Sequence, residues 1–407
     1  MTAEIAILNR NAVAMAADSA VTLQLPGGQK IYNTELYDKE CDSLEEYASD
    51  FVNFFERENI LFPEELQSES ASGYLRLGFF QLRRRIDAEV DRTIKNLGSI
   101  DEEQVKTLVR EKSTEFLNEL EKSEELPGFG PEDLPRCAAR CERNIREAIE
   151  EVFEKLPIEH CRQELERTGS LVLCKKFARR EYSGVVIAGY GEKDVFPVLL
   201  SYECECVINN KLRYIETNRV KIGTTSDPVT ASVVPFAQRE MVNRFMEGVD
   251  PKYTEEVERY VSALLTRGYP SRIAEALAGK ITPELQDLLR KELTELGSKL
   301  VEDLTEGLQD YRQSQFISPV IESVAYLPKE ELAAMAESLV NLTAFKRRMT
   351  SAETDTVALP IDVAVISKGD GFIWIKRKHY FEPALNRHFF SNYYRKDETK
   401  KHGESRT

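Results

Sequence analysis

The second residue of the chain is a threonine, a residue that can perform unusual chemistry when it stands at a free chain terminus. If Met1 is removed, Thr2 carries both a hydroxyl nucleophile and a free α-amine. The unperturbed pKa of an α-amine is about 7.7–8.0, so it can act as a general base near neutral pH. A small second residue also favours removal of the initiator methionine. We therefore take Thr2 as a candidate nucleophile.

The residues after Thr2 predict a hairpin that returns an acid toward it. Residues 3–8 are short, apolar and β-prone, residues 9–11 (Asn-Arg-Asn) are typical of a turn, and residues 12–17 form a second apolar run. That run ends at Asp18. Because the second strand of a hairpin ends level with the start of the first, we expect Asp18 to lie near Thr2.

A basic residue follows this hairpin after a Pro-Gly-Gly turn signal at residues 26–28, namely Lys30. A lysine beside the α-amine would keep that amine neutral by like-charge repulsion, and the Asp18 carboxylate would hold the lysine in place. The alternative interpretation is that Asp18 and Lys30 are a surface pair that flanks an ordinary hairpin.

The second half of the chain contains further strand and helix patterns. Residues 184–191 predict a buried strand that ends in glycines, and residues 196–202 predict the next strand. A short helix is expected at 236–245, and apolar residues recur at helical spacing over 332–345. Residues 360–375 predict a closing strand, a glycine-bearing turn and another strand.

Together these segments resemble the N-terminal nucleophile hydrolases of the proteasome β-subunit type. The matching stretches are the opening Thr-Ala-Glu-Ile, residues 15–22 (Met-Ala-Ala-Asp-Ser-Ala-Val-Thr), residues 30–32 (Lys-Ile-Tyr) and, most specifically, residues 361–372 (Ile-Asp-Val-Ala-Val-Ile-Ser-Lys-Gly-Asp-Gly-Phe). The resemblance implies that Thr2 is the nucleophile, that Asp18 orients Lys30, and that Lys30 relays protons. It also nominates Ser232 and Asp355 as further polar residues of the site.

The resemblance implies an α+β fold, a four-layer αββα sandwich with two antiparallel sheets and large helical insertions. We expect a discontinuous core from residues 1–42, 178–250 and 312–380. Charged sequences with helical apolar spacing predict insertions at 43–177 and 251–311. Residues 381–407 are expected to form a polar C-terminal tail.

One part of the family pattern is missing. Residues 33–42 are polar and contain no glycine, where the family has a strand pair leading to the glycine whose N–H forms the oxyanion hole. Gly189 or the turn at Gly223 could in principle supply that donor. Two functions therefore stay open. The first is a threonine-nucleophile peptidase that forms an acyl-enzyme on Thr2, and the second is a catalytically impaired subunit that acts as a structural or binding module.

Composition limits the partners. The formal net charge of −15 argues against nucleic acid, whose phosphates require clustered Lys and Arg. No stretch of 18 apolar residues predicts a membrane span, and no signal peptide is recognisable before Thr2. We expect a peptide or protein substrate, and the resemblance implies a homo-oligomer, often a ring, sometimes served by an ATP-dependent unfoldase.

The seven cysteines are odd in number and scattered, as expected for a reducing cytoplasm. Cys137 and Cys141 lie one helical turn apart, with His160 and Cys161 downstream, which makes an unconvincing zinc set. No metal and no cofactor is expected, and the threonine mechanism needs neither.

Overall fold

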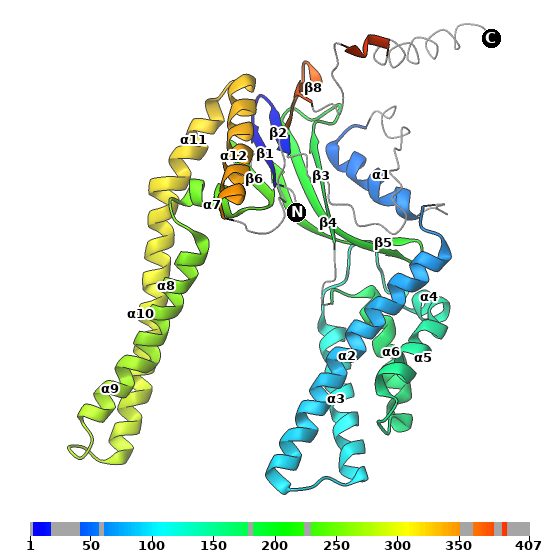
Figure 1. The fold of residues 1–407 in the computed structure, drawn as a ribbon, viewed down its shortest axis with the longest axis vertical. Coiled ribbons are helices and arrows are strands. Elements are labelled where there is room, and N and C mark those ends of the chain that lie inside the picture. The colour runs from blue at the N-terminus through cyan, green and yellow to red at the C-terminus, as the bar shows by residue number, and fades with distance from the viewer. Residues whose placement is uncertain are drawn as a thin grey trace. The chain divides into compact units, whose positions relative to one another are not determined.

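The computed structural model describes residues 3–17, 41–56, 61–177, 182–223, 229–350, 361–377 and 385–388. These residues form a mixed α+β protein with two antiparallel sheets (Figure 1). The chain divides into two compact units. The first comprises Met1–Ile31, Val195–Pro197 and Lys221–Thr407, and the second comprises Tyr32–Asp194 and Val198–Val220.

The first unit contains a five-stranded sheet with the order β6-β1-β2-β7-β8. Its strands are β1 (Ala3–Asn9), β2 (Val13–Ala17), β6 (Ala231–Ala237), β7 (Asp362–Ser367) and β8 (Gly371–Lys376). The antiparallel pairs β1–β2 and β7–β8 confirm the two hairpins predicted from the sequence. Pairing of β2 with β7 joins the hairpins, and β6 adds to the free side of β1.

The turn of the opening hairpin is held by Asn9, which is fully buried. Its side-chain oxygen accepts hydrogen bonds from the backbone N–H groups of Asn11 (2.9 Å) and Ala12 (3.3 Å), an Asx-type turn. Its side-chain nitrogen donates to the carbonyls of Val324 (3.0 Å) and Leu327 (2.8 Å). One asparagine therefore closes the hairpin locally and ties it to a distant helix end.

One face of this sheet packs on helix α12 (Lys329–Thr350), which confirms the helix predicted over 332–345. Alternate strand residues point to the same face of a sheet, so Ile5 and Ile7 share the packing face with the small Ala14 and Ala16. On the helix side the packed residues are Leu332, Ala333, Ala336, Leu339, Val340 and Ala344.

The first unit also contains the second predicted helical block. Helices α8 (Pro251–Ala263), α9 (Tyr269–Ala276) and α10 (Pro283–Arg312) make up this block, and α7 (Glu240–Glu247) and α11 (Ser318–Tyr326) flank it. Two π-helical segments lie at Leu264–Gly268 and Gln313–Ile317. A Cβ added at Gly297 of α10 would lie 2.4 Å from the carbonyl oxygen of Leu265, so glycine allows close helix contact there. The short helix expected over 236–245 begins only at Glu240, because residues 236 and 237 continue β6.

The described residues of the second unit form a three-stranded sheet in the order β3-β4-β5 and six α-helices. The strands are β3 (Ser183–Gly189), β4 (Val198–Ile208) and β5 (Lys211–Lys221), and the helices are α1 (Leu44–Glu56), α2 (Glu64–Leu97), α3 (Glu102–Lys122), α4 (Asp133–Arg140), α5 (Glu142–Phe153) and α6 (Arg162–Cys174). These helices fall within residues 43–177, for which the sequence predicted helices. The strand predicted at 184–191 is present but mostly half-exposed, because β3 lies at the edge of its sheet.

The division into units cuts through the core expected from the sequence. Strands β3, β4 and β5 belong to the same unit as the helices of 43–177, whereas β1, β2, β6, β7 and β8 belong to the other. None of the described helices combines the length and apolar character that a membrane crossing requires.

Candidate functional site

Most of the residues proposed for the threonine site lie outside the described part of the chain. Thr2, Asp18, Lys30 and Asp355 belong to this group, and so does most of the 33–42 segment. Ser232 is described, and it lies in β6 opposite Leu8 of β1.

The strand register shows which chain ends meet at the start of β1. Ala3 pairs with Ala237 of β6, and Glu4 pairs with Ala17 of β2. The described ends of β1 and β2 that lead to positions 2 and 18 therefore lie at the same edge of the sheet. Ser232 is five residues from Ala237, about 17 Å along the strand at roughly 3.4 Å per residue, so it lies toward the other end of β6.

A polar side chain that sequence analysis missed lies next to this edge. Gln238 directly follows Ala237, and it is only 7% exposed. Neither its side-chain nitrogen nor its side-chain oxygen has a hydrogen-bond partner in the part of the chain that the structure describes. A buried carboxamide without hydrogen-bond partners destabilises the folded state, so its presence at this position calls for an explanation. A single glutamine after a β-run carries no recognisable signal, and the pairing of β6 with β1 had to be known first.

One of the two glycines that the sequence suggested as oxyanion-hole donors already uses its backbone N–H in another hydrogen bond. The backbone N–H of Gly223 donates to the carbonyl of Val229 at 2.9 Å. Gly223 has φ +73°, and a Cβ there would lie 2.5 Å from the Phe196 ring. This glycine therefore serves a tight turn, and its N–H is not available for an oxyanion.

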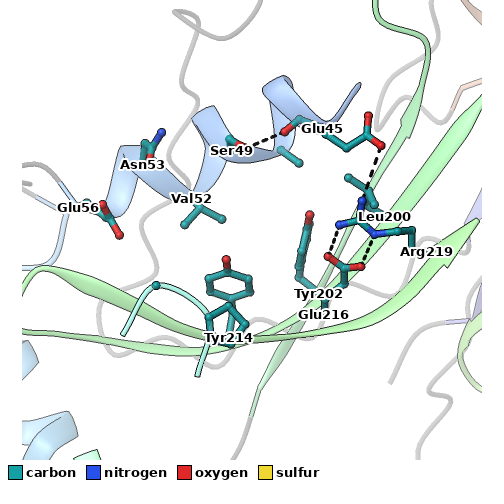
Figure 2. Close-up of a pocket in the computed structure, with 13 residues that line it drawn as sticks. Glu45, Ser49, Val52, Asn53, Glu56, Leu200, Tyr202, Tyr214, Glu216 and Arg219 are labelled. Atoms are coloured by element: carbon teal, nitrogen blue, oxygen red, sulfur yellow. Dashed lines mark hydrogen bonds and ion pairs between the residues drawn. The ribbon is translucent and has the colours of Figure 1, made fainter. Parts of the chain in front are cut away.

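The second unit contains a pocket of about 320 Å³ between α1 and the strands β4 and β5 (Figure 2). One wall is formed by positions 45, 48, 49, 52, 53 and 56 of α1, whose spacing of three and four residues places them on one helix face. The floor carries Leu200, Tyr202 and Tyr214, and residues 127 and 128 close one side.

Charged residues lie at both ends of this pocket. Arg219 forms a two-pronged contact with Glu216, from Nε to Oε1 at 2.6 Å and from Nη2 to Oε2 at 2.7 Å. Its Nη1 lies 3.6 Å from Oε1 of Glu45. Glu56 lines the pocket from the other end of α1 (Figure 2). The hydrogen bond to Glu216 raises the pKa of Arg219, so this guanidinium stays charged.

Two tyrosines rise from the sheet toward α1 between these charged ends (Figure 2). The rings of Tyr202 and Tyr214 meet edge to face, with centroids 5.4 Å apart and an interplanar angle of 82°. Burial raises the pKa of Tyr202 to about 12 and also raises the pKa of Tyr214. Both phenols therefore stay neutral near pH 7. Each tyrosine offers the pocket a polar hydroxyl and an aromatic ring face.

The start of α1 is positioned by a loop distant in sequence. The side chain of Asp194 accepts hydrogen bonds from the N–H groups of Leu44 (2.9 Å) and Gly191 (2.7 Å). A Cβ at Gly191 would lie 2.3 Å from the Cα of Ser43, so only glycine permits this approach. The glycine-ending strand noted in the sequence thus docks α1 over the sheet and shapes the pocket.

Metal ligands do not gather in the described ranges, where no group of three or more His, Cys, Asp or Glu side chains is arranged to hold an ion. Cys137, Cys141 and Cys161 are buried in the helical core of the second unit. The Nε2 atom of His160 lies 3.1 Å from the carbonyl oxygen of Lys106.

Comparison with known proteins gives no match to this chain among family models, curated proteins or solved structures.

Proposed function

We propose that the protein is an N-terminal threonine amidohydrolase, a proteasome-like peptidase of the four-layer αββα type. In this proposal Met1 is removed, Asp18 orients Lys30, and Lys30 keeps the α-amine of Thr2 neutral. Asp355 remains a weaker candidate for a further polar residue of the site, whereas Ser232 is left out of it because it pairs with Leu8 toward the other end of β6. Cytoplasmic location, self-association into rings and cooperation with an ATP-dependent unfoldase belong to the same proposal, on the strength of the family resemblance.

The reaction balances without a cofactor. The Thr2 hydroxyl oxygen attacks the amide carbonyl carbon while the α-amine accepts the hydroxyl proton. The α-amine then gives this proton to the leaving nitrogen as the C–N bond breaks, which leaves an ester on Thr2. Water attacks that ester, its proton passes to the α-amine and then to the Thr2 oxygen, and the acid product leaves.

The observation that carries the proposal is the edge formed by Ala3, Ala17 and Ala237 with the buried Gln238 beside it. Directly opposed residues on antiparallel strands share a face of the sheet. Gln238 directly follows Ala237, the residue that pairs with Ala3 at this edge. Carboxamide N–H groups can stabilise an oxyanion, so Gln238 is our candidate for the donor that the sequence lacks.

The test is intact-mass analysis of the purified full chain before and after treatment with a β-lactone and an epoxyketone. We expect loss of Met1 and one adduct on Thr2 with each probe, since an epoxyketone engages both the hydroxyl and the α-amine. Thr2→Ser should keep both adducts, whereas Thr2→Ala should lose both. Retention of Met1, or an equal adduct on Thr2→Ala, would exclude the proposed chemistry.

A second candidate is an inactive member of the same fold that acts as a structural or binding module. The specific observation in its favour is that the Gly223 N–H is bonded to Val229 and offers no donor. Removal of Met1 without any adduct at Thr2 would support this second candidate.

A further inference from the structure

Helices α8 and α10 of the first unit run antiparallel and side by side as a two-helix arm, and both expose large apolar side chains (Figure 1). A spacing of four residues on α10, and of seven and four on α8, places these side chains on one face of each helix. They are between 40% and 71% exposed, and they are Leu300, Leu304 and Leu308 of α10, Tyr253 and Tyr260 of α8, and Leu264 just after α8.

The two apolar rows lie on the same side of the arm. On α10, Leu300 and Leu304 each directly precede a half-buried residue, and on α8 Tyr253 and Tyr260 do the same. One residue is about 100° of rotation on an α-helix, so both rows are turned away from the packed side in the same sense. Antiparallel helices whose rows are turned in the same sense present them to a common side. The arm therefore has one continuous apolar face, and contiguous apolar patches on soluble proteins often mark interaction sites.

Charged residues border this face, acidic along α10 and basic along α8. Asp303 and Asp310 each directly precede an exposed apolar residue of α10, and Lys252 and Arg259 do the same on α8. These charges are therefore turned outward by a further step of about 100°, along the two outer edges of the face. The two basic residues hold exposed ion pairs within their own chain, a kind that contributes little to stability.

Contacts inside the arm establish which residues of the two helices are level. A Cβ added at Gly297 of α10 would lie 2.4 Å from the carbonyl oxygen of Leu265, so these two positions are level. Asp303 is six residues beyond Gly297, and Arg259 is six residues before Leu265. Because the helices are antiparallel, Asp303 and Arg259 are level with each other on opposite edges of the face.

The same count applies to the other border residues. Asp310 is thirteen residues beyond position 297, and Lys252 is thirteen residues before position 265, so these two are level as well. Lys299 interrupts the acidic border, but it is level with Ala263 of α8 and so has no like charge opposite it. Each edge of the face therefore carries the charge that complements the other edge at the same level.

We propose that this face docks on the same face of a second copy of the chain, with the two-fold axis parallel to the arm. Rotation about such an axis keeps every residue at its own level and sets α10 of one copy on α8 of the other. Asp303 then faces Arg259 of the second copy, and Asp310 faces Lys252. A two-fold axis across the arm would set α10 on α10 and oppose the two acidic borders, so charge selects the first arrangement.

The face is large enough for a specific contact. Residues 251–268 of α8 and the following π-helical segment span about 27 Å at roughly 1.5 Å per residue, and two packed helices are about 20 Å wide. This corresponds to about 1,100 Å² over the two copies, just above the roughly 1,000 Å² expected of a biological interface. We therefore expect a dissociation constant in the micromolar range. The inference does not depend on the threonine chemistry, because all of its residues lie between 251 and 312.

The test is sedimentation equilibrium of the full chain between about 1 and 200 µM, a range that brackets a micromolar dissociation constant. We expect a monomer–dimer equilibrium. Leu304→Glu should raise the dissociation constant at least about tenfold, because it places a charge inside the apolar contact. The matched control is Leu97→Glu at an exposed leucine of α2, which should leave the dissociation constant unchanged. Circular dichroism establishes that each variant keeps its helix content.

Charge reversal tests the arrangement of the two copies. Asp303→Arg and Arg259→Asp should each raise the dissociation constant about fivefold, and the double variant should return it to within about twofold of the wild-type value. Glu119→Arg at an exposed position of α3 is the charge control and should have no effect. A wild-type protein that stays monomeric at about 200 µM would overturn the proposal, and so would equal association of Leu304→Glu. Tighter association of Asp303→Arg alone would mean that α10 faces α10, which also overturns it.

Discussion

The guanidinium of Arg213 and the carboxylate of Glu205 form an ion pair at 3.1 Å, with side chains only 0% and 3% exposed. Arg213 also donates to the carbonyls of Val172, Leu173 and Lys175 at the end of α6. The Tyr74 ring lies below the guanidinium, with its centroid 4.4 Å away. The Arg213 side chain therefore both neutralises the buried Glu205 carboxylate and donates hydrogen bonds to the backbone carbonyls at the end of α6.

We expect Arg213→Met to lower the free energy of unfolding by about 3–5 kcal/mol, because it leaves Glu205 buried without its cation. Replacing both residues by methionine should restore part of the loss. Chemical denaturation followed by circular dichroism measures both. Arg143→Met is the control, since Arg143 is 88% exposed and its loss should cost less than about 0.5 kcal/mol. A mild effect of Arg213→Met would mean that water or another cation reaches Glu205.

Acid stability should depend on Asp133, a buried residue at the start of α4. Burial alone would raise the pKa of Asp133, but hydrogen bonds from Lys211 (2.8 Å) and the Gly130 N–H (2.8 Å) outweigh it and lower the pKa. A lowered folded-state pKa contributes stability above the unfolded value of about 3.9, and this contribution is lost as pH falls through the folded value.

Unfolding free energies measured from pH 6 downward should therefore fall below about pH 4, and Asp133→Asn should flatten this fall. Asp87→Asn, at an exposed residue of α2, is the comparison. An unchanged acid slope in Asp133→Asn would show that the Lys211 contact contributes little.

Gln238→Leu should separate stability from reactivity. Removing a buried carboxamide that has no partner among the described residues should raise the melting temperature, because the desolvation cost of about 1–3 kcal/mol disappears. If Gln238 stabilises the oxyanion, the same change should slow acylation of Thr2 by a β-lactone about 10²–10³-fold. The matched control is Gln315→Leu at an exposed position, which should alter neither quantity.

The β-lactone experiment distinguishes failure of the proposed function from failure of the proposed role of Gln238. Wild-type protein without an adduct would remove the proposed function, and the role of Gln238 with it. A wild-type adduct that forms equally fast in Gln238→Leu would remove the role of Gln238 alone.

The local elements of this protein were predictable from the sequence. Two short apolar runs and an Asn-Arg-Asn turn predicted β1 and β2, and the Asn9 side chain accepts hydrogen bonds from the backbone of Asn11 and Ala12 in that turn. The closing hairpin and α12 followed from equally local patterns. These signals act over a few residues, so no knowledge of distant chain segments is needed to interpret them.

The tertiary structure alone decided which distant segments meet. Pairing of β6 with β1 sets the surroundings of Gln238, and Asp194 caps a helix that begins 150 residues earlier. The pocket joins one face of α1 to strands more than 140 residues later. Such contacts depend on strand register and on the fit of packed surfaces, which are properties of the whole chain. A glutamine, two tyrosines and three glutamates carry no common pattern until folding brings them to their places.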